Sequence, residues 1–161
     1  MRERLCTRAA DWAVLGGRST LLLDRMEESA PLQIVGLDGK FVQFQFSHRT
    51  KEEAVFIVSL HAPWLTAESR MTTYIYGPPT KFFDEMATSW RGWEGEKAWA
   101  EIEGRVSLRA TSDRLGHLAL RVRLRPDPAR FGQAEEVVEL EAGQLDHLAE
   151  EVRRFFGSYA I

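Results

Sequence analysis

One aspartate and one histidine lie close enough in the sequence to work together as an acid–base pair. Asp113 and His117 both belong to the segment TSDRLGH, residues 111–117. A carboxylate that orients an imidazole is a common arrangement in general acid–base catalysis, and a further carboxylate nearby would complete such a site. The same segment is a polar turn, in which an aspartate ordinarily hydrogen-bonds its own backbone and the histidine begins the next strand. The composition favours the turn, and the acid–base pair is kept as the alternative.

Other reactive groups give weaker signals. Cys6 has Arg4 and Arg8 beside it, and nearby cations favour the thiolate, but no partner base lies close to it in the sequence. The histidines lack the short spacings of metal ligands; they are His48, His61, His117 and His147. The signatures of nucleophile-elbow hydrolases, zinc proteases and phosphate- or dinucleotide-binding loops are missing. We therefore expect no catalytic residue, no metal and no cofactor, which favours a protein that is not an enzyme.

Tryptophans and charged residues gather in the segment WRGWEGEKAW, residues 90–99. Tryptophan and arginine are the residue types that most often anchor protein interfaces. We expect Trp90 to face the core, because of its spacing from Phe83 and Met86, and Trp99 to lie on the polar side of its strand. The residues that we assign to a protein-binding site are Arg91, Trp93, Glu94, Glu96, Trp99 and, after Pro63, Trp64. The alternative is that the loop folds back and its indoles cap the open end of the core.

Arginines recur on the outward-facing positions of neighbouring predicted strands. The outward residues are Glu101, Glu103, Arg105 and Arg109 on one strand, Arg121, Arg123 and Arg125 on the next, and Glu135, Glu139 and Glu141 on the last. Such a stripe could bind nucleic acid or an acidic partner. The matching glutamates favour a cross-strand ladder of opposite charges instead. Since no aromatic residues for base stacking stand between these arginines, we do not expect a nucleic-acid partner.

The composition is that of one ordinary globular domain. The 161 residues are 44% hydrophobic and 28% charged, with a formal net charge of -3 and a single cysteine. One cysteine cannot form an internal disulfide, and no apolar run reaches the roughly 20 residues that span a membrane. We expect a cytoplasmic protein that does not associate with membranes. Residues 1–18 read as a flexible leader and residues 19–161 as a single domain.

The hydrophobic periodicity predicts strands and two helices in an order without βαβ alternation. The predicted strands are 19–26, a hairpin over 31–46 that turns at Asp38-Gly39, 53–61, 70–76, a long strand over 98–110 that bends at Gly104, 118–124 and 135–141. Amphipathic helices are expected at about 80–90 and 143–156. This order predicts an α+β fold, with a largely antiparallel sheet of about six to eight strands and both helices packed on one face.

The segment between residues 81 and 156 carries a family resemblance. Its pattern includes Phe82-Phe83, the run Trp90-Arg91-Gly92-Trp93-Glu94-Gly95-Glu96, Trp99, Glu103, Asp113, Gly116-His117 and a closing Phe155-Phe156. This pattern resembles an uncharacterised family of small bacterial proteins, frequent in actinobacteria, whose function is unknown. The resemblance implies no activity, cofactor or site residue.

Three hypotheses about function follow from the residues. The first is a non-enzymatic protein–protein interaction module, for example an immunity-type binder of a bacterial toxin, because a compact acidic binder suits a basic partner. The second is an uncommon enzyme that uses Asp113, His117 and a nearby carboxylate. The third is a structural module that assembles with further copies of itself.

Overall fold

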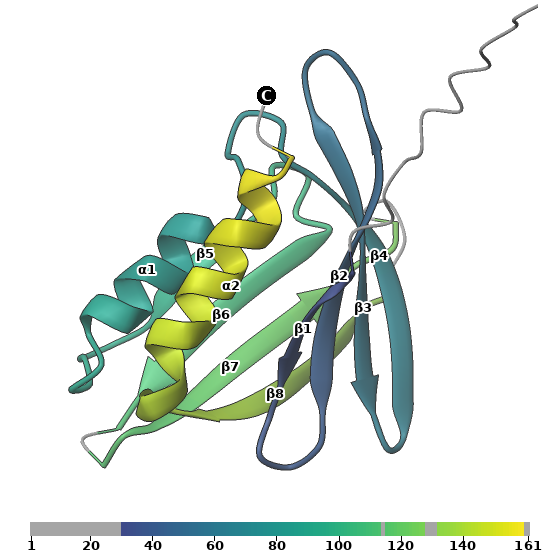
Figure 1. Ribbon diagram of the computed structural model, residues 1–161. Helices are drawn as coiled ribbons and strands as arrows, with labels where there is room; N and C mark the ends of the chain where they lie inside the picture. Colours follow the sequence, from purple (N-terminus) through teal and green to yellow (C-terminus); the bar gives the residue numbers. More distant parts are fainter. Residues whose placement is uncertain (1–29, 114, 128–131, 160–161) are drawn as a thin grey trace, which may run out of the picture.

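The computed structural model describes residues 30–113, 115–127 and 132–159, which form eight strands and two α-helices (Figure 1). The first four strands are β1 (Leu32–Val35), β2 (Phe41–Arg49), β3 (Ala54–Ala62) and β4 (Leu65–Thr72). After helix α1 (Thr80–Thr88) come β5 (Lys97–Ala100), β6 (Val106–Ser112), β7 (His117–Leu124) and β8 (Ala134–Glu141). A short 3₁₀ turn, Ala142–Gln144, leads into helix α2 (Leu145–Gly157). The predicted α+β class is therefore confirmed. The leader, the strand at 19–26 and Cys6 lie outside the described residues.

The strands form two antiparallel sheets of four, β1-β2-β3-β4 and β5-β6-β7-β8, each in chain order. The hairpin predicted at Asp38-Gly39 is confirmed: Gly39 has a φ of 78°, which favours glycine, and Val42 pairs with Ile34 across the turn. The apolar run of β3 lies between β2 and β4, where a strand is buried on both faces. The sequence pattern predicted the strands but did not separate them into two sheets.

Two of the predicted strands differ from the observed ones. Strand β4 covers 65–72 rather than 70–76, because Tyr76 donates its backbone N–H to the carbonyl of Tyr74 and closes a tight turn. The long strand expected over 98–110 is a hairpin of β5 and β6, in which Trp99 pairs with Leu108. Gly104, with a φ of 67°, lies in the turn of this hairpin and not at a bend in one strand.

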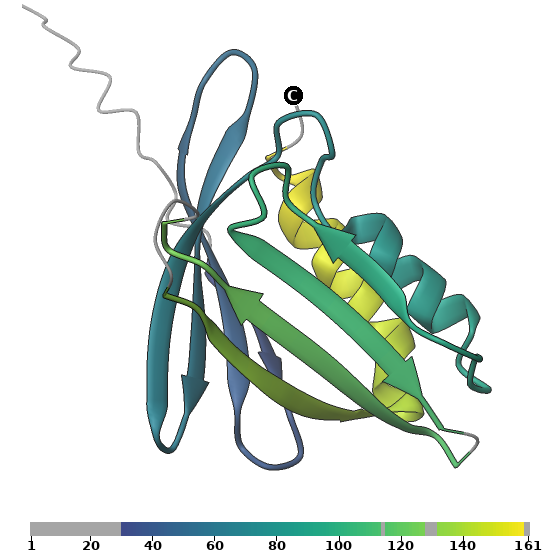
Figure 2. The ribbon, with the colours of Figure 1, turned by 180° about the vertical axis from the view of Figure 1, so that it is seen from behind.

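Both helices lie on the same face of the β5–β8 sheet, as predicted, and none of the described helices or strands covers its opposite face (Figures 1 and 2). Helix α2 also packs against the first sheet: the ring of Phe156 is 5.7 Å from that of Phe44 and 5.0 Å from that of Phe56. The core is therefore shared by the two sheets and the two helices. In the described part of the chain, no helix is both long enough and apolar enough to cross a membrane.

The edge of β8 is covered by the turn between β1 and β2. Leu37 donates its backbone N–H to the carbonyl of Glu139 at 2.9 Å, and the Lys40 ammonium lies 3.3 Å from the carbonyl of Val137. At Gly36 a Cβ atom would lie 3.0 Å from the carbonyl oxygen of Glu139 and 2.8 Å from a methyl group of Val138, so this approach requires a glycine. The turn thus joins the two sheets and covers the edge of β8, whose backbone groups would otherwise be open to pairing with another chain.

Candidate functional site

Asp113 and His117 form the pair that the sequence suggested. One carboxylate oxygen of Asp113, Oδ1, accepts the backbone N–H groups of Leu115 and His117 at 2.8 and 2.9 Å. The other, Oδ2, lies 2.8 Å from Nδ1 of the His117 ring. The hydrogen bond and charge of Asp113 raise the pKa of His117, and Glu141 and Glu139 add smaller contributions. The same hydrogen bond lowers the pKa of Asp113. The turn and the acid–base pair are therefore both present in one structure.

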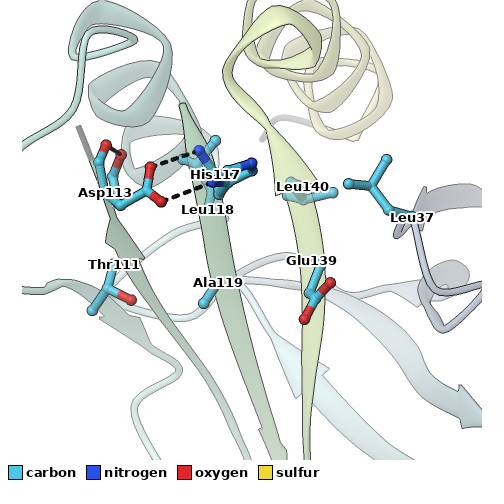
Figure 3. A pocket seen from close by; sticks show the side chains of 9 residues that line it. Leu37, Thr111, Asp113, His117, Leu118, Ala119, Glu139 and Leu140 are labelled. Atoms are coloured by element: carbon cyan, nitrogen blue, oxygen red, sulfur yellow. Dashed lines mark hydrogen bonds and ion pairs between the residues drawn. The ribbon is translucent and has the colours of Figure 1, made fainter. Parts of the chain in front are cut away.

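The pair lies at the rim of a pocket of about 390 Å³ (Figure 3). Its walls come from β6, β7, β8 and the turn before β2, and they include Thr111, Ala119, Glu139, Leu140 and Leu37. Asp113 and His117 are both exposed at this rim. Among the described residues, no hydroxyl or thiol hydrogen-bonds the His117 ring, so the pair orients an imidazole but activates no nucleophile in the described structure.

The loop that leads from α1 to β5 packs directly against this turn. At Gly92, where φ is 99°, a Cβ atom would lie 2.9 Å from the backbone oxygen of Asp113. The indole N–H of Trp93 donates to the carbonyl of Ala110 on β6 at 3.3 Å, and the ammonium of Lys97 lies 5.3 Å from the centre of the Trp93 ring. Trp93 is half-buried and anchors the loop to the sheet, and so it packs against the core as the alternative interpretation expected.

Two large apolar side chains next to this contact are exposed. Trp90 is 53% exposed and Leu115, in the β6–β7 turn, is 82% exposed. The prediction that Trp90 faces the core is wrong, because α1 ends at Thr88 and its helical spacing does not extend to residue 90. The guanidinium of Arg91 lies 5.0 Å from the centre of the Trp90 ring and holds the exposed indole in place. We call Trp90, Arg91, Asp113, Leu115 and His117 the loop surface.

The outer face of the β5–β8 sheet carries the expected ladder of opposite charges. Arg123 and Arg121 both pair with Glu135, at 2.8 and 3.4 Å, and Arg109 pairs with Glu96 at 2.9 Å. The ladder interpretation is confirmed for Arg121, Arg123 and Glu135. Arg109 pairs instead with Glu96, which the sequence analysis assigned to the protein-binding site, whereas Glu94 is exposed in the same loop.

Trp99 and Glu101 lie on the opposite side from the one that the sequence pattern predicted. Trp99 packs against the core, and its indole nitrogen is buried with no hydrogen-bond partner in the described structure. Glu101 is 2% exposed, and one of its carboxylate oxygens accepts the backbone N–H groups of Glu103 and Arg105. Burial raises the pKa of Glu101. Glu101 therefore stabilises the turn of the β5–β6 hairpin, and Trp99 is a partly buried side chain that packs against the core.

Trp64 is not brought to the loop surface. It lies in the β3–β4 turn and is 69% exposed. Its indole N–H donates to the carboxylate of Glu136 on β8 at 2.6 Å, and the Lys40 ammonium lies 5.1 Å from its ring centre. Lys40 is itself 3.3 Å from Glu136 and 3.0 Å from Asp38. These contacts, which the sequence reasoning missed, indicate a cap between the two sheets.

Sequence reasoning also missed Leu115, Leu37 and Glu139. A signal for Leu115 was available, because a leucine inside the polar turn TSDRLGH has no core to enter. Leu37, likewise an apolar residue beside the Asp38-Gly39 turn, gave the same kind of signal. Glu139 gave none, since its place in the pocket, opposite Ala119, depends on the register between β7 and β8.

No group of three or more metal-ligating side chains occurs in the part of the chain that the structure describes.

The comparisons with known proteins give a family without a known role. The profile of a family of unknown function, DUF6228, matches residues 36–159, a longer stretch than the one on which the sequence resemblance rested. No curated protein matches the chain. A solved structure titled crystal structures of Trypanosoma brucei MRP1/MRP2 is similar, with a TM-score of 0.43 and 14% identity, over 85% of this chain and 92% of that one.

Proposed function

The chain belongs to DUF6228, a family of unknown function, and from its site we propose that it is a protein–protein interaction module without catalytic activity of its own. The observation that carries this proposal is the loop surface. There an exposed tryptophan and an exposed leucine stand on two segments that the contact of Gly92 with Asp113 holds together.

The composition of the loop surface supports the proposal. A tryptophan braced by an arginine offers a large, rigid contact area, and such residues supply most of the binding energy in protein interfaces. Leu115, at 82% exposure, loses little by leaving water for a partner and gains the free energy of apolar burial. Asp113 and His117 add polar groups whose orientation is fixed before binding.

A binder of this kind could neutralise a toxin by covering its active site, which is the more specific form of the proposal. The net charge of -3 suits a basic partner, since complementary charge accelerates association. The specific form predicts that the purified chain inhibits the partner's activity at a one-to-one ratio.

The experiment is photo-crosslinking from the loop surface in lysate of the native host. A photoreactive amino acid replaces Leu115, and a matched control places it at Glu68, an exposed position on β4. A single protein crosslinked from position 115 and not from position 68 is the expected result. Its affinity for the Trp90→Ala/Leu115→Ala double variant should fall by about 30-fold or more, as for interface residues worth about 2 kcal/mol. If the partner binds the double variant and the unchanged chain with equal affinity, the proposal is overturned.

A second function is supported by the 2.8 Å contact between Asp113 and His117 at the rim of a pocket. If the chain is an enzyme that uses this pair, it should turn over some compound in a metabolite extract. Asp113→Asn should abolish this turnover and Trp90→Ala should leave it unaffected.

If the chain assembles with further copies of itself, which is the third hypothesis, light scattering should show a dimer or larger species. The Trp90→Ala/Leu115→Ala variant should disrupt this species.

A further inference from the structure

The pocket beside His117 has the chemistry of a site for an amphipathic cation. Two carboxylates line it, those of Asp113 and Glu139, and the carboxylate of Glu141 is near enough to raise the pKa of His117. Figure 3 shows Asp113 and Glu139 on different strands, on either side of the strand that carries His117 and Ala119. The negative charge is therefore distributed around the pocket and not concentrated on one segment.

Among the residues that the structure describes, the neighbouring cations do not neutralise these carboxylates. Arg121, on the next row of β7, pairs with Glu135 at 3.4 Å. Lys40, in the turn before β2, lies 3.0 Å from Asp38 and 3.3 Å from Glu136. Neither cation lines the pocket. Counting the described residues alone, the pocket with its neighbour Glu141 keeps a negative charge even when His117 is protonated.

One apolar side chain is exposed at the pocket. Leu37 lines it and is 55% exposed in spite of its size, whereas Leu118 and Leu140, which also line it, are each 2% exposed and belong to the core. An exposed apolar side chain beside carboxylates suits a ligand with a hydrocarbon stem and a cationic head, as in the side chains of arginine and lysine. A volume of about 390 Å³ admits one such side chain. A carboxylate also accepts a guanidinium through two parallel hydrogen bonds.

We propose that this pocket binds an arginine or lysine side chain presented by the protein partner, with the stem against Leu37 and the cation between Asp113 and Glu139. This inference rests on the proposed function, because it names the chemistry of the partner that the loop surface meets. The exposed anchors, Trp90 and Leu115, then provide apolar contact, while the pocket selects for a basic residue.

The test uses a blocked tripeptide, N-acetyl-Ala-Arg-Ala-amide, as the probe for the ¹⁵N-labelled full chain. The expected result is saturable shifts of the backbone amides of His117, Leu118 and Glu139, with a Kd of about 1–10 mM, as suits a single side chain. The same tripeptide with citrulline, which keeps the shape and lacks the charge, should bind at least about tenfold more weakly. An Asp113→Asn/Glu139→Gln double variant should show the same loss, and a Glu68→Gln control should bind as the unchanged chain does.

Equal binding of the arginine and citrulline peptides, or shifts spread over unrelated carboxylates, would overturn the inference. The Trp90→Ala/Leu115→Ala variant separates the two proposals. If it loses the crosslinked partner but binds the arginine tripeptide normally, both proposals stand. If the partner binds the Asp113→Asn/Glu139→Gln variant unchanged, the inference fails and the proposed function survives. If the tripeptide binds and no partner depends on the loop surface, the proposed function fails and the cation site remains.

Discussion

The carboxylate of Asp113 contacts His117 twice: Oδ1 accepts the backbone N–H of His117 at 2.9 Å, and Oδ2 lies 2.8 Å from Nδ1 of its ring. One side chain thus closes the β6–β7 turn and fixes the orientation of the imidazole. The first contact is structural, whereas the second presents the ring at the rim of a pocket.

This relationship predicts the titration of His117. Its pKa, measured by NMR on the ring protons, should lie above the usual 6.5, because the carboxylate of Asp113 stabilises the imidazolium. Asp113→Asn should lower it towards the usual value, whereas Glu68→Gln should not change it. Since the folded pKa is raised, the contribution of His117 to stability is complete below the unfolded pKa and is lost as the pH rises through the folded one. An unchanged pKa in Asp113→Asn would contradict the assigned contact.

The close approach of Gly36 to β8 predicts a destabilising substitution. Gly36→Ala places a methyl group against the backbone oxygen of Glu139, which cannot move without disturbing β8. We expect a loss of about 1–3 kcal/mol in the free energy of unfolding, measured with urea. Gly143→Ala is the matched control, because no atom lies within 4 Å of the added Cβ and the residue has no positive φ. If both variants unfold at the same urea concentration, the turn does not pack on β8 as described.

The strained backbone conformation of Ile75 leads us to predict a stabilising substitution at this position. It has a φ of 62°, between Tyr74 and Tyr76, whose backbone groups are joined by a 2.7 Å hydrogen bond. A β-branched residue rarely adopts this conformation, and the strain costs about 1 kcal/mol or more. Ile75→Asn should therefore raise the free energy of unfolding by about 0.5–1 kcal/mol, since asparagine tolerates positive φ. Tyr74→Asn, at an exposed neighbour with an ordinary φ, should give no such gain.

The buried carboxylate of Glu101 predicts different effects for two substitutions. Glu101→Ala removes the acceptor of two backbone N–H groups and should cost about 1–3 kcal/mol. Glu101→Gln keeps an acceptor oxygen and should cost less. Because burial raises the folded pKa of Glu101 above 4.5, its contribution to stability is present at low pH and is lost as the pH rises through the folded value. The free energy of unfolding of Glu101→Gln, relative to that of the unchanged chain, should therefore rise as the pH is raised from about 4 to about 8. Urea unfolding measures this difference.

Local chemistry explains which parts of the fold could be predicted from the sequence. Asp38-Gly39 specifies its own turn, and the alternation along β2 and β7 specifies which side chains are buried. The β5–β6 hairpin could not be predicted, because Ala98, Ala100, Val106 and Leu108 are spaced in the sequence as on one face of a single strand. The turn between the strands reverses this pattern, so that Val106 and Leu108 are buried. Trp99 enters the core there, and the two alanines are exposed.

In the candidate site, too, the local contact could be predicted from the sequence and the contacts between distant segments could not. Asp113 and His117 are four residues apart in one turn, so their contact is local and could be read from the sequence. Glu139 and Leu37 reach the same pocket through the pairing of β7 with β8 and the docking of a distant turn. The local sequence indicates that Leu37 is exposed, but neither the strand register nor the docking of the turn can be predicted from nearby residues.

The most direct measurement is the affinity of the crosslinked partner for two variants of the chain. Trp90→Ala/Leu115→Ala changes the loop surface, and Trp64→Ala removes a tryptophan that is more exposed than Trp90 from the cap between the sheets. We predict that affinity falls by about 30-fold or more for the first variant and by less than about twofold for the second, with both variants folded by circular dichroism. Unchanged binding to the first variant, or an equal loss for Trp64→Ala, would contradict the assignment of the interaction to the loop surface.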